Sequence, residues 1–152
     1  MSGREELNEI FRLCDSMFEN AQIDFDELVS RKIDEKFFDD YNNTRIVNSF
    51  LFNFTKLQDK IGAKLFKKVL YELKEIDSFS IPMIDVLNRL EKIEIIEEAT
   101  AWDGLREVRN ILAHEYPLDI EERVENIQLT LDGYRTLKRI YERLRSRGYE
   151  IR

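Results

Sequence analysis

Apolar residues recur along most of this chain at steps of three and four, and this spacing predicts helices rather than strands. The first such face lies within residues 7–28. Its members are Leu7, Ile10, Phe11, Cys14, Met17, Phe18, Ala21, Phe25 and Leu28. The charged segment that follows, residues 30–40, predicts a bend between this helix and the next.

The second predicted helix is apolar on more than one side. Its main stripe is formed by Ile46, Phe50, Phe54, Leu57 and Ile61. Further apolar positions beside the stripe are Val47, Leu51, Phe52, Leu65, Phe66, Val69 and Leu70. A helix of this kind is buried on more than one side. We therefore expect it in the middle of a bundle, ending near Glu75.

A third, short helix is expected over residues 82–91, after a turn at residues 77–80. Pro82 suits the first turn of a helix, where a missing backbone N–H leaves no bond unmade. A fourth helix is expected over residues 95–115. Pro117 disfavours helical geometry at the preceding residue, so this helix should end just before Tyr116.

The last predicted helix has the most regular stripe. Its apolar positions are Ile120, Val124, Ile127, Leu131, Tyr134, Leu137, Tyr141 and Leu144. Asp119 followed by Glu122 resembles a capping box that opens this helix. Gly148, just beyond the stripe, is expected to serve as a C-terminal stop.

These segments predict an all-α fold of about five helices. Short connections favour antiparallel neighbours, so an up-and-down antiparallel helical bundle is expected. The length of 152 residues fits a single domain over residues 1–152, and no repeat or linker interrupts it.

The composition limits the chemistry that one chain can carry. A single cysteine and a single histidine exclude an internal disulfide and leave too few ligands for a structural zinc site. No cofactor is expected, although a Mg²⁺ ion held by carboxylates stays open. Cys14 lies within an apolar stripe, which is typical of a buried cysteine rather than a nucleophile.

The N-terminal residues are polar, and no window approaches the roughly 18 apolar residues of a membrane span. With one unpaired cysteine and no apolar signal core, the sequence predicts a cytoplasmic protein with no membrane contact.

The net charge of −7 argues against nonspecific coating of nucleic acid, which needs a basic face. A local basic site is still compatible with this charge, because residues 135–152 hold seven basic and two acidic residues. This cluster is either a solvated helix face or a surface for nucleic acid or a protein partner.

One stretch, from Arg109 to Tyr116, combines an arginine, an amide, a histidine and a phenol. At the helical period, Asn110 and His114 share a face. Arg109 and His114 point about 140° apart. Arg109 therefore either bends toward His114 or joins it in a pocket shared with a second chain.

These residues match the pattern R-N-x-x-x-H-x-Y. The pattern resembles the motif of the HEPN superfamily, especially the HepT-like toxins and the substrate-binding proteins of minimal nucleotidyltransferases. The resemblance extends over about residues 43–144, including Trp102, the phenylalanine-rich second helix and the long helix after the motif.

The resemblance implies a symmetric homodimer whose motifs meet at the interface and act as a metal-independent endoribonuclease on RNA. By position, Arg109 and His114 would be catalytic and Asn110 would be a supporting polar group. The implied partner is a minimal nucleotidyltransferase antitoxin, which would transfer AMP to Tyr116 and silence the nuclease.

The residue types suit this chemistry. Histidine exchanges protons near neutral pH, and arginine offers a permanently charged fork to phosphoryl oxygens. A two-fold dimer would supply the second histidine that acid–base catalysis requires. Alternatively, Arg109 or water handles one of the proton transfers. AMP on Tyr116 would block the pocket and neutralise its positive charge.

Two other functions stay open. One is a non-catalytic subunit that binds a nucleotide or presents a substrate to a nucleotidyltransferase, and the other is a helical interaction module.

The motif residues also have purely structural interpretations. Arg109 would then pair with a glutamate, such as Glu107 or Glu115 from the other chain, and Asn110 would satisfy a buried backbone group. His114 would cap its helix, Tyr116 would be a core ring, and Trp102 is expected in the core.

Overall fold

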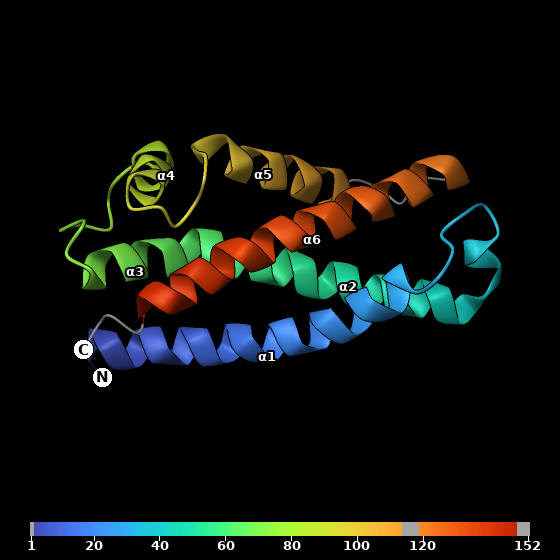
Figure 1. Cartoon of the computed structure of the whole chain (residues 1–152), viewed down its shortest axis with the longest axis horizontal. Coiled ribbons are helices and arrows are strands. Elements are labelled where there is room, and N and C mark those ends of the chain that lie inside the picture. The colour runs from blue at the N-terminus through green and yellow to red at the C-terminus, as the bar shows by residue number, and fades with distance from the viewer. Residues whose placement is uncertain (1, 114–118, 149–152) are drawn as a thin grey trace.

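The computed structural model describes residues 2–113 and 119–148, and every regular element in this part of the chain is helical. Five helices form an elongated bundle when α2 and α3, which a π turn joins without a break, are counted as one (Figure 1). The elements are α1 (Gly3–Val29), a 3₁₀ turn (Phe37–Asp39), α2 (Tyr41–Lys60), the π turn (Ile61–Leu65), α3 (Phe66–Glu72), α4 (Met83–Lys92), α5 (Ala99–Ala113) and α6 (Ile120–Gly148).

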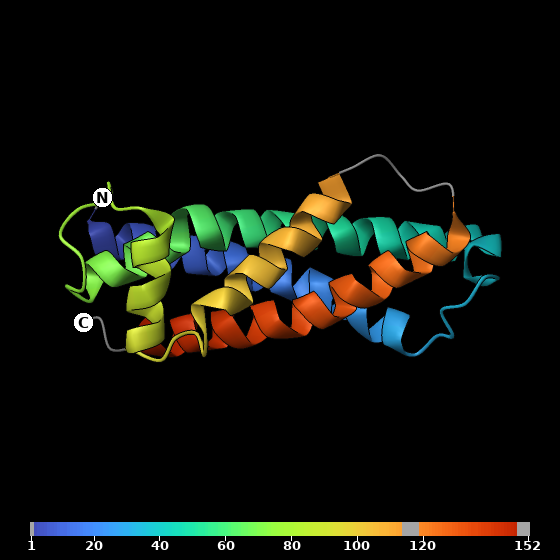
Figure 2. The same ribbon diagram turned by 90° about the horizontal axis from the view of Figure 1, so that it is seen from above.

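The lengthwise helices follow one another in the order α1, α2–α3, α5 and α6, and they alternate in direction (Figure 1). This arrangement confirms the expected all-α antiparallel bundle. The short α4 lies across one end of the bundle (Figure 2). It connects α3 to α5 at that end, so α5 starts from the same end as α1.

The long helix formed by α2 and α3 lies in the middle of the bundle and contacts each of the other helices. Phe50, Phe54 and Phe66 from this helix are no more than 1% exposed. Its central position confirms the interpretation of its two-sided apolar pattern. Phe52 differs, because its ring is 62% exposed on the outer face of α2.

Cys14 is completely buried in α1, as its place in the apolar stripe predicts. Burial raises the pKa of its thiol to about 11. The thiol is therefore protonated at neutral pH, and a protonated thiol is a poor nucleophile.

The fourth helix begins later than expected, at Ala99 instead of residue 95. The reason is the end of α4, where Glu94 adopts a positive φ of 64°. The Ile95 N–H donates to the Leu90 carbonyl at 2.9 Å, and the Glu94 N–H donates to the Glu91 carbonyl at 3.0 Å. This pair of bonds defines a Schellman cap, which buries Ile95 in a turn.

The final helix begins as expected, at Ile120 after Asp119. The Asp119 carboxylate accepts a hydrogen bond from the Glu121 N–H at 2.9 Å. As described, α6 extends to Gly148, where the stop was expected, but Gly148 is itself helical and its φ is not positive, so it is not a left-handed cap. A Cβ atom there would lie 2.7 Å from Cε2 of Phe11, so the glycine allows α6 to approach the Phe11 ring on α1.

Candidate functional site

The two motif residues that the structure describes lie near the end of α5. Arg109 and Asn110 follow a buried face of this helix that includes Trp102 and Leu105. The buried face fixes α5 against α2, and the motif side chains then fall at the edge of the contact between the two helices. His114 and Tyr116, the other two predicted site residues, lie outside the described residues.

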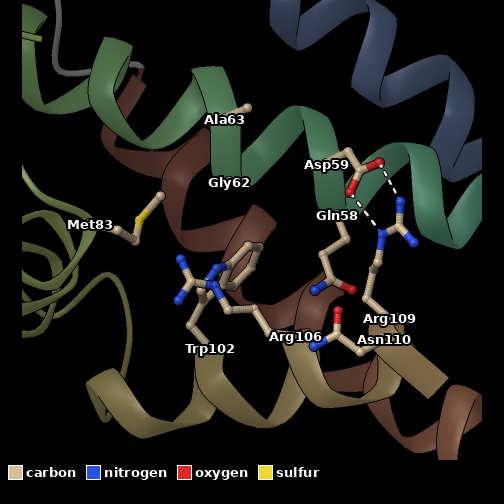
Figure 3. Close-up of a pocket in the computed structure, with 9 residues that line it drawn as sticks. All are labelled: Gln58, Asp59, Gly62, Ala63, Met83, Trp102, Arg106, Arg109 and Asn110. Carbon is tan, nitrogen blue, oxygen red and sulfur yellow. Dashed lines mark hydrogen bonds and ion pairs between the residues drawn. The ribbon is translucent and has the colours of Figure 1, made fainter. Parts of the chain in front are cut away.

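Arg109 forms a two-pronged ion pair with Asp59 on α2. Its Nε and Nη2 atoms each donate to one carboxylate oxygen of Asp59 at 3.3 Å (Figure 3). The expectation of Glu107 as the partner is therefore wrong, and Glu115 of a second chain lies outside the described residues. The Arg109 side chain is 33% exposed and that of Asp59 is 52% exposed, so solvent reaches both groups.

The Arg109–Asp59 pair borders a cleft of about 410 Å³ between α2 and α5 (Figure 3). Three buried residues form its floor: Gln58 through its amide, Gly62 through its backbone and Trp102 through its indole. A volume of this size lies within the usual range of small-molecule sites.

The rim of the cleft is polar and charged. Arg106, Arg109 and Asn110 line one side from α5, and Asp59 lines the other side from α2. Arg106 also forms a long ion pair with Asp103 at 3.9 Å, and its side chain is 46% exposed. Asn110 is exposed at this rim, so the interpretation that it satisfies a buried backbone group is wrong.

The floor depends on an unusual close approach between two helices. Gly62 lies in the π turn, and a Cβ atom at this position would lie 2.7 Å from Cζ2 of Trp102. The indole also makes an edge contact with Phe66, with ring centroids 4.6 Å apart. Trp102 is 2% exposed and belongs to the core, as expected, while it also closes the cleft from below. Short π turns inside α-helices frequently occur at functional sites.

Gln58 places a buried side-chain acceptor at the floor of the cleft. The residue is 3% exposed, and its Oε1 atom accepts no hydrogen bond from the described residues. An unsatisfied buried polar atom destabilises a fold by about 1–3 kcal/mol. Figure 3 shows the Gln58 amide pointing toward the amide of Asn110. The buried oxygen therefore lies beneath an exposed side chain that can rotate away.

Sequence reasoning identified Arg109 and Asn110 but not Gln58, Asp59 or Arg106. A signal for Gln58 exists, because this polar residue follows Phe54 by four positions and precedes Ile61 by three on the apolar face of α2. A signal for Arg106 also exists, since it precedes Asn110 by one helical turn. Asp59 carries no such signal, because its pairing depends on how α2 meets α5.

Other kinds of site receive no support from the described residues. In residues 2–113 and 119–148, no three or more His, Cys, Asp or Glu residues gather as metal ligands would. Within the same residues, no helix combines the length and the apolar character needed to cross a bilayer.

Comparison of the chain with protein-family models, with curated proteins and with solved structures found no match. The HEPN resemblance accordingly depends on the residues of the motif and their helical context.

The Arg109–Asp59 pair leads to a first prediction. We expect Asp59→Asn to change the free energy of unfolding by less than about 1 kcal/mol, because exposed ion pairs contribute little. Removing the carboxylate also removes a competitor for the guanidinium. Inorganic phosphate should then bind more tightly, by about fivefold for a unit charge near 4 Å in water.

Urea denaturation and phosphate titration by NMR measure the two effects. The matched control is Asp132→Asn, which removes the carboxylate of an exposed pair with Arg135 on α6. Unchanged phosphate affinity in Asp59→Asn, equal to that of the control, would show that Arg109 does not bind anions.

Proposed function

We propose that this chain is a metal-independent endoribonuclease of the HEPN type, and that it cleaves RNA as a symmetric dimer. The observation that carries the proposal is the position of the R-N-x-x-x-H-x-Y motif. Its arginine and amide lie at the rim of an open cleft, and the arginine is exposed to solvent. An arginine with two donors in one plane suits the oxygens of a phosphodiester.

The proposed reaction needs no metal. The ribose 2′-oxygen loses its proton and attacks phosphorus, and the bond from phosphorus to the 5′-oxygen breaks as that oxygen gains a proton. The products are a 2′,3′-cyclic phosphate and a 5′-hydroxyl. In this scheme Arg109 stabilises the charge on the phosphoryl oxygens, and His114 transfers protons.

Asp59 would position the arginine before RNA binds. Both of its oxygens accept from the Arg109 guanidinium, so the long side chain is held at the rim of the cleft. A phosphate that approaches from solvent would compete with Asp59 for the same donors. Water can hydrate the exposed Asp59 carboxylate once it is displaced, so the free-energy cost of exchanging Asp59 for phosphate is small.

The dimer is part of the proposal because one chain contains one histidine. A two-fold axis near the end of α5 would bring two His114 residues and two Arg109 residues into one pocket. Silencing is proposed to follow AMP transfer to Tyr116 by a minimal nucleotidyltransferase partner. The added phosphate would occupy the arginines and obstruct the pocket.

The direct test is RNA cleavage by the purified, metal-stripped chain in EDTA. We expect cleavage of single-stranded RNA with 2′,3′-cyclic phosphate ends, which mass spectrometry of the fragments identifies. A substrate with a 2′-deoxyribose at the cleaved residue should stay intact, because it lacks the attacking oxygen. Intact RNA after incubation with folded dimer that carries no AMP on Tyr116 would contradict the proposal.

A second function is supported by the unpaired Gln58 oxygen at the floor of the cleft. A non-catalytic subunit that binds a nucleotide for a nucleotidyltransferase partner would use this oxygen and would need no RNA cleavage. Nucleotide binding without cleavage in the same EDTA assay would favour this second function.

A further inference from the structure

We infer that the cleft between α2 and α5 is a base-binding subsite that accepts a nucleobase with an exocyclic amino group, through the buried oxygen of Gln58. The inference deepens the proposed ribonuclease function, because it assigns the subsite to an RNA residue beside the scissile phosphate. Its basis is the cleft, the unmade bond of Gln58 and the place of Arg109 at the rim.

The first step concerns Gln58. Its Oε1 atom is an acceptor without a donor, in a residue that is 3% exposed and lines the cleft. Few buried polar atoms lack a partner in native proteins, and such an atom calls for an explanation. A ligand that donates an N–H bond to this oxygen would remove the penalty of its burial.

The second step concerns Asn110 and the shape of the ligand. The two amides point toward one another in Figure 3, so a ligand that enters when Asn110 rotates would meet both groups. Side-chain amides recognise base edges on which an amino donor lies beside a ring acceptor. Adenine and cytosine present this pattern, whereas hypoxanthine and uracil present a carbonyl in place of the amine.

The third step concerns the rim. Arg106 lies one helical turn before Asn110, lines the same cleft and is 46% exposed. Planar guanidinium groups stack on unpaired bases in RNA-binding proteins. Arg106 can therefore cover the base while Arg109, one residue before Asn110, binds the attached phosphate.

The fourth step concerns the floor. The close contact between Gly62 and Trp102 places the indole directly against the π turn. A buried indole cannot stack on a base, but it forms a rigid apolar wall beneath Gln58. Binding energy at this site would thus come from the amides and from Arg106, and the wall would exclude water from their hydrogen bonds.

The test compares nucleotides that differ in one group: AMP with IMP, and CMP with UMP, titrated by calorimetry into the full chain. We expect the amino-bearing member of each pair to bind roughly tenfold more tightly, the usual value of a good amide contact to a base. Gln58→Leu should remove this preference. The matched control is Gln128→Leu, the same change at an exposed position on α6, which should keep the preference.

Two further measurements separate a binding role of Gln58 from a structural role. Gln58→Leu removes an unsatisfied buried polar atom, so its Tm should rise by about 2–4 °C, while a structural amide would lower the Tm. Ala63→Leu enlarges an exposed lining residue and should weaken binding of all four nucleotides without disturbing the core.

Equal binding within both nucleotide pairs, or a preference that persists in Gln58→Leu, would overturn the inference. So would undiminished binding in Ala63→Leu, which would place the ligand elsewhere.

Mapping of cleavage sites on an RNA with all four bases shows whether the cleft binds RNA or a free nucleotide. We expect fewer cuts beside uracil; a preference in binding with no such bias in cleavage overturns the assignment to RNA. Selective binding without any cleavage in EDTA contradicts the ribonuclease proposal instead and leaves the base-binding cleft in place.

Discussion

Arg109→Ala is expected to slow RNA cleavage by about 10²–10³-fold, the usual loss when one donor to a developing negative charge is removed. The guanidinium would no longer stabilise the phosphoryl oxygens as the 2′-oxygen attacks. The measurement is kcat/KM for a short fluorogenic RNA in EDTA. His114→Ala should lose about 10²–10⁴-fold in the same assay, because proton transfer is lost.

The loss of activity should not come from unfolding. The Arg109 side chain is 33% exposed, and the loss of its ion pair with Asp59 should destabilise the chain by no more than about 1 kcal/mol. Arg89→Ala is a matched control, because Arg89 is 41% exposed, pairs with Glu75 at 3.8 Å and lies outside the basic cluster of residues 135–152. If Arg109→Ala cleaved RNA as fast as Arg89→Ala does, Arg109 would have no part in catalysis.

Trp102→Ala is expected to lower the free energy of unfolding by about 3–5 kcal/mol, the range measured when large buried aromatic rings are truncated. Trp102 is 2% exposed and packs against Phe66 and the backbone at Gly62. The cavity left behind would open the floor of the cleft. Urea denaturation followed by circular dichroism measures the effect, because Trp102 is the single tryptophan and its fluorescence disappears.

Phe52→Ala provides the comparison for this prediction. The Phe52 ring is 62% exposed on α2, so its truncation should change stability by no more than about 0.5 kcal/mol. Similar losses in the two variants would mean that the contact between Trp102 and Gly62 does not hold α5 against α2.

Much of the fold was predictable because buried faces leave a periodic trace in the sequence. Most residues in the stripes of α1, α2–α3 and α6 are buried in the bundle, although Ile120 at the start of α6 is 40% exposed. The start of α5 was not predictable in this way, since Ile95 is apolar yet lies in the Schellman cap after α4. The usual sequence signal of such a cap is a glycine at the positive-φ position, and here that position holds Glu94.

The candidate site was predictable only where its residues are neighbours in sequence. Arg109 and Asn110 belong to a local motif, and both line the cleft. Asp59 and Gly62 join them across fifty residues or so of chain, through the packing of α2 on α5. Nothing in local spacing encodes that packing. Gln58 left a trace as a polar residue within an apolar face.

The π turn Ile61–Leu65 lets the longest helix hold one extra residue and keep its two halves in phase. A π turn holds one more residue than an α turn, whereas an extra residue in a regular helix would rotate everything after it by about 100°. Because the wider turn takes up the extra residue, Gln58 of α2 and Phe66 of α3 are both buried. Ala63 is exposed in this turn, so its deletion should leave a regular helix with nearly the same buried face. A length change of one residue, which would misplace a buried face elsewhere in this helix, is therefore tolerated at this point of the chain.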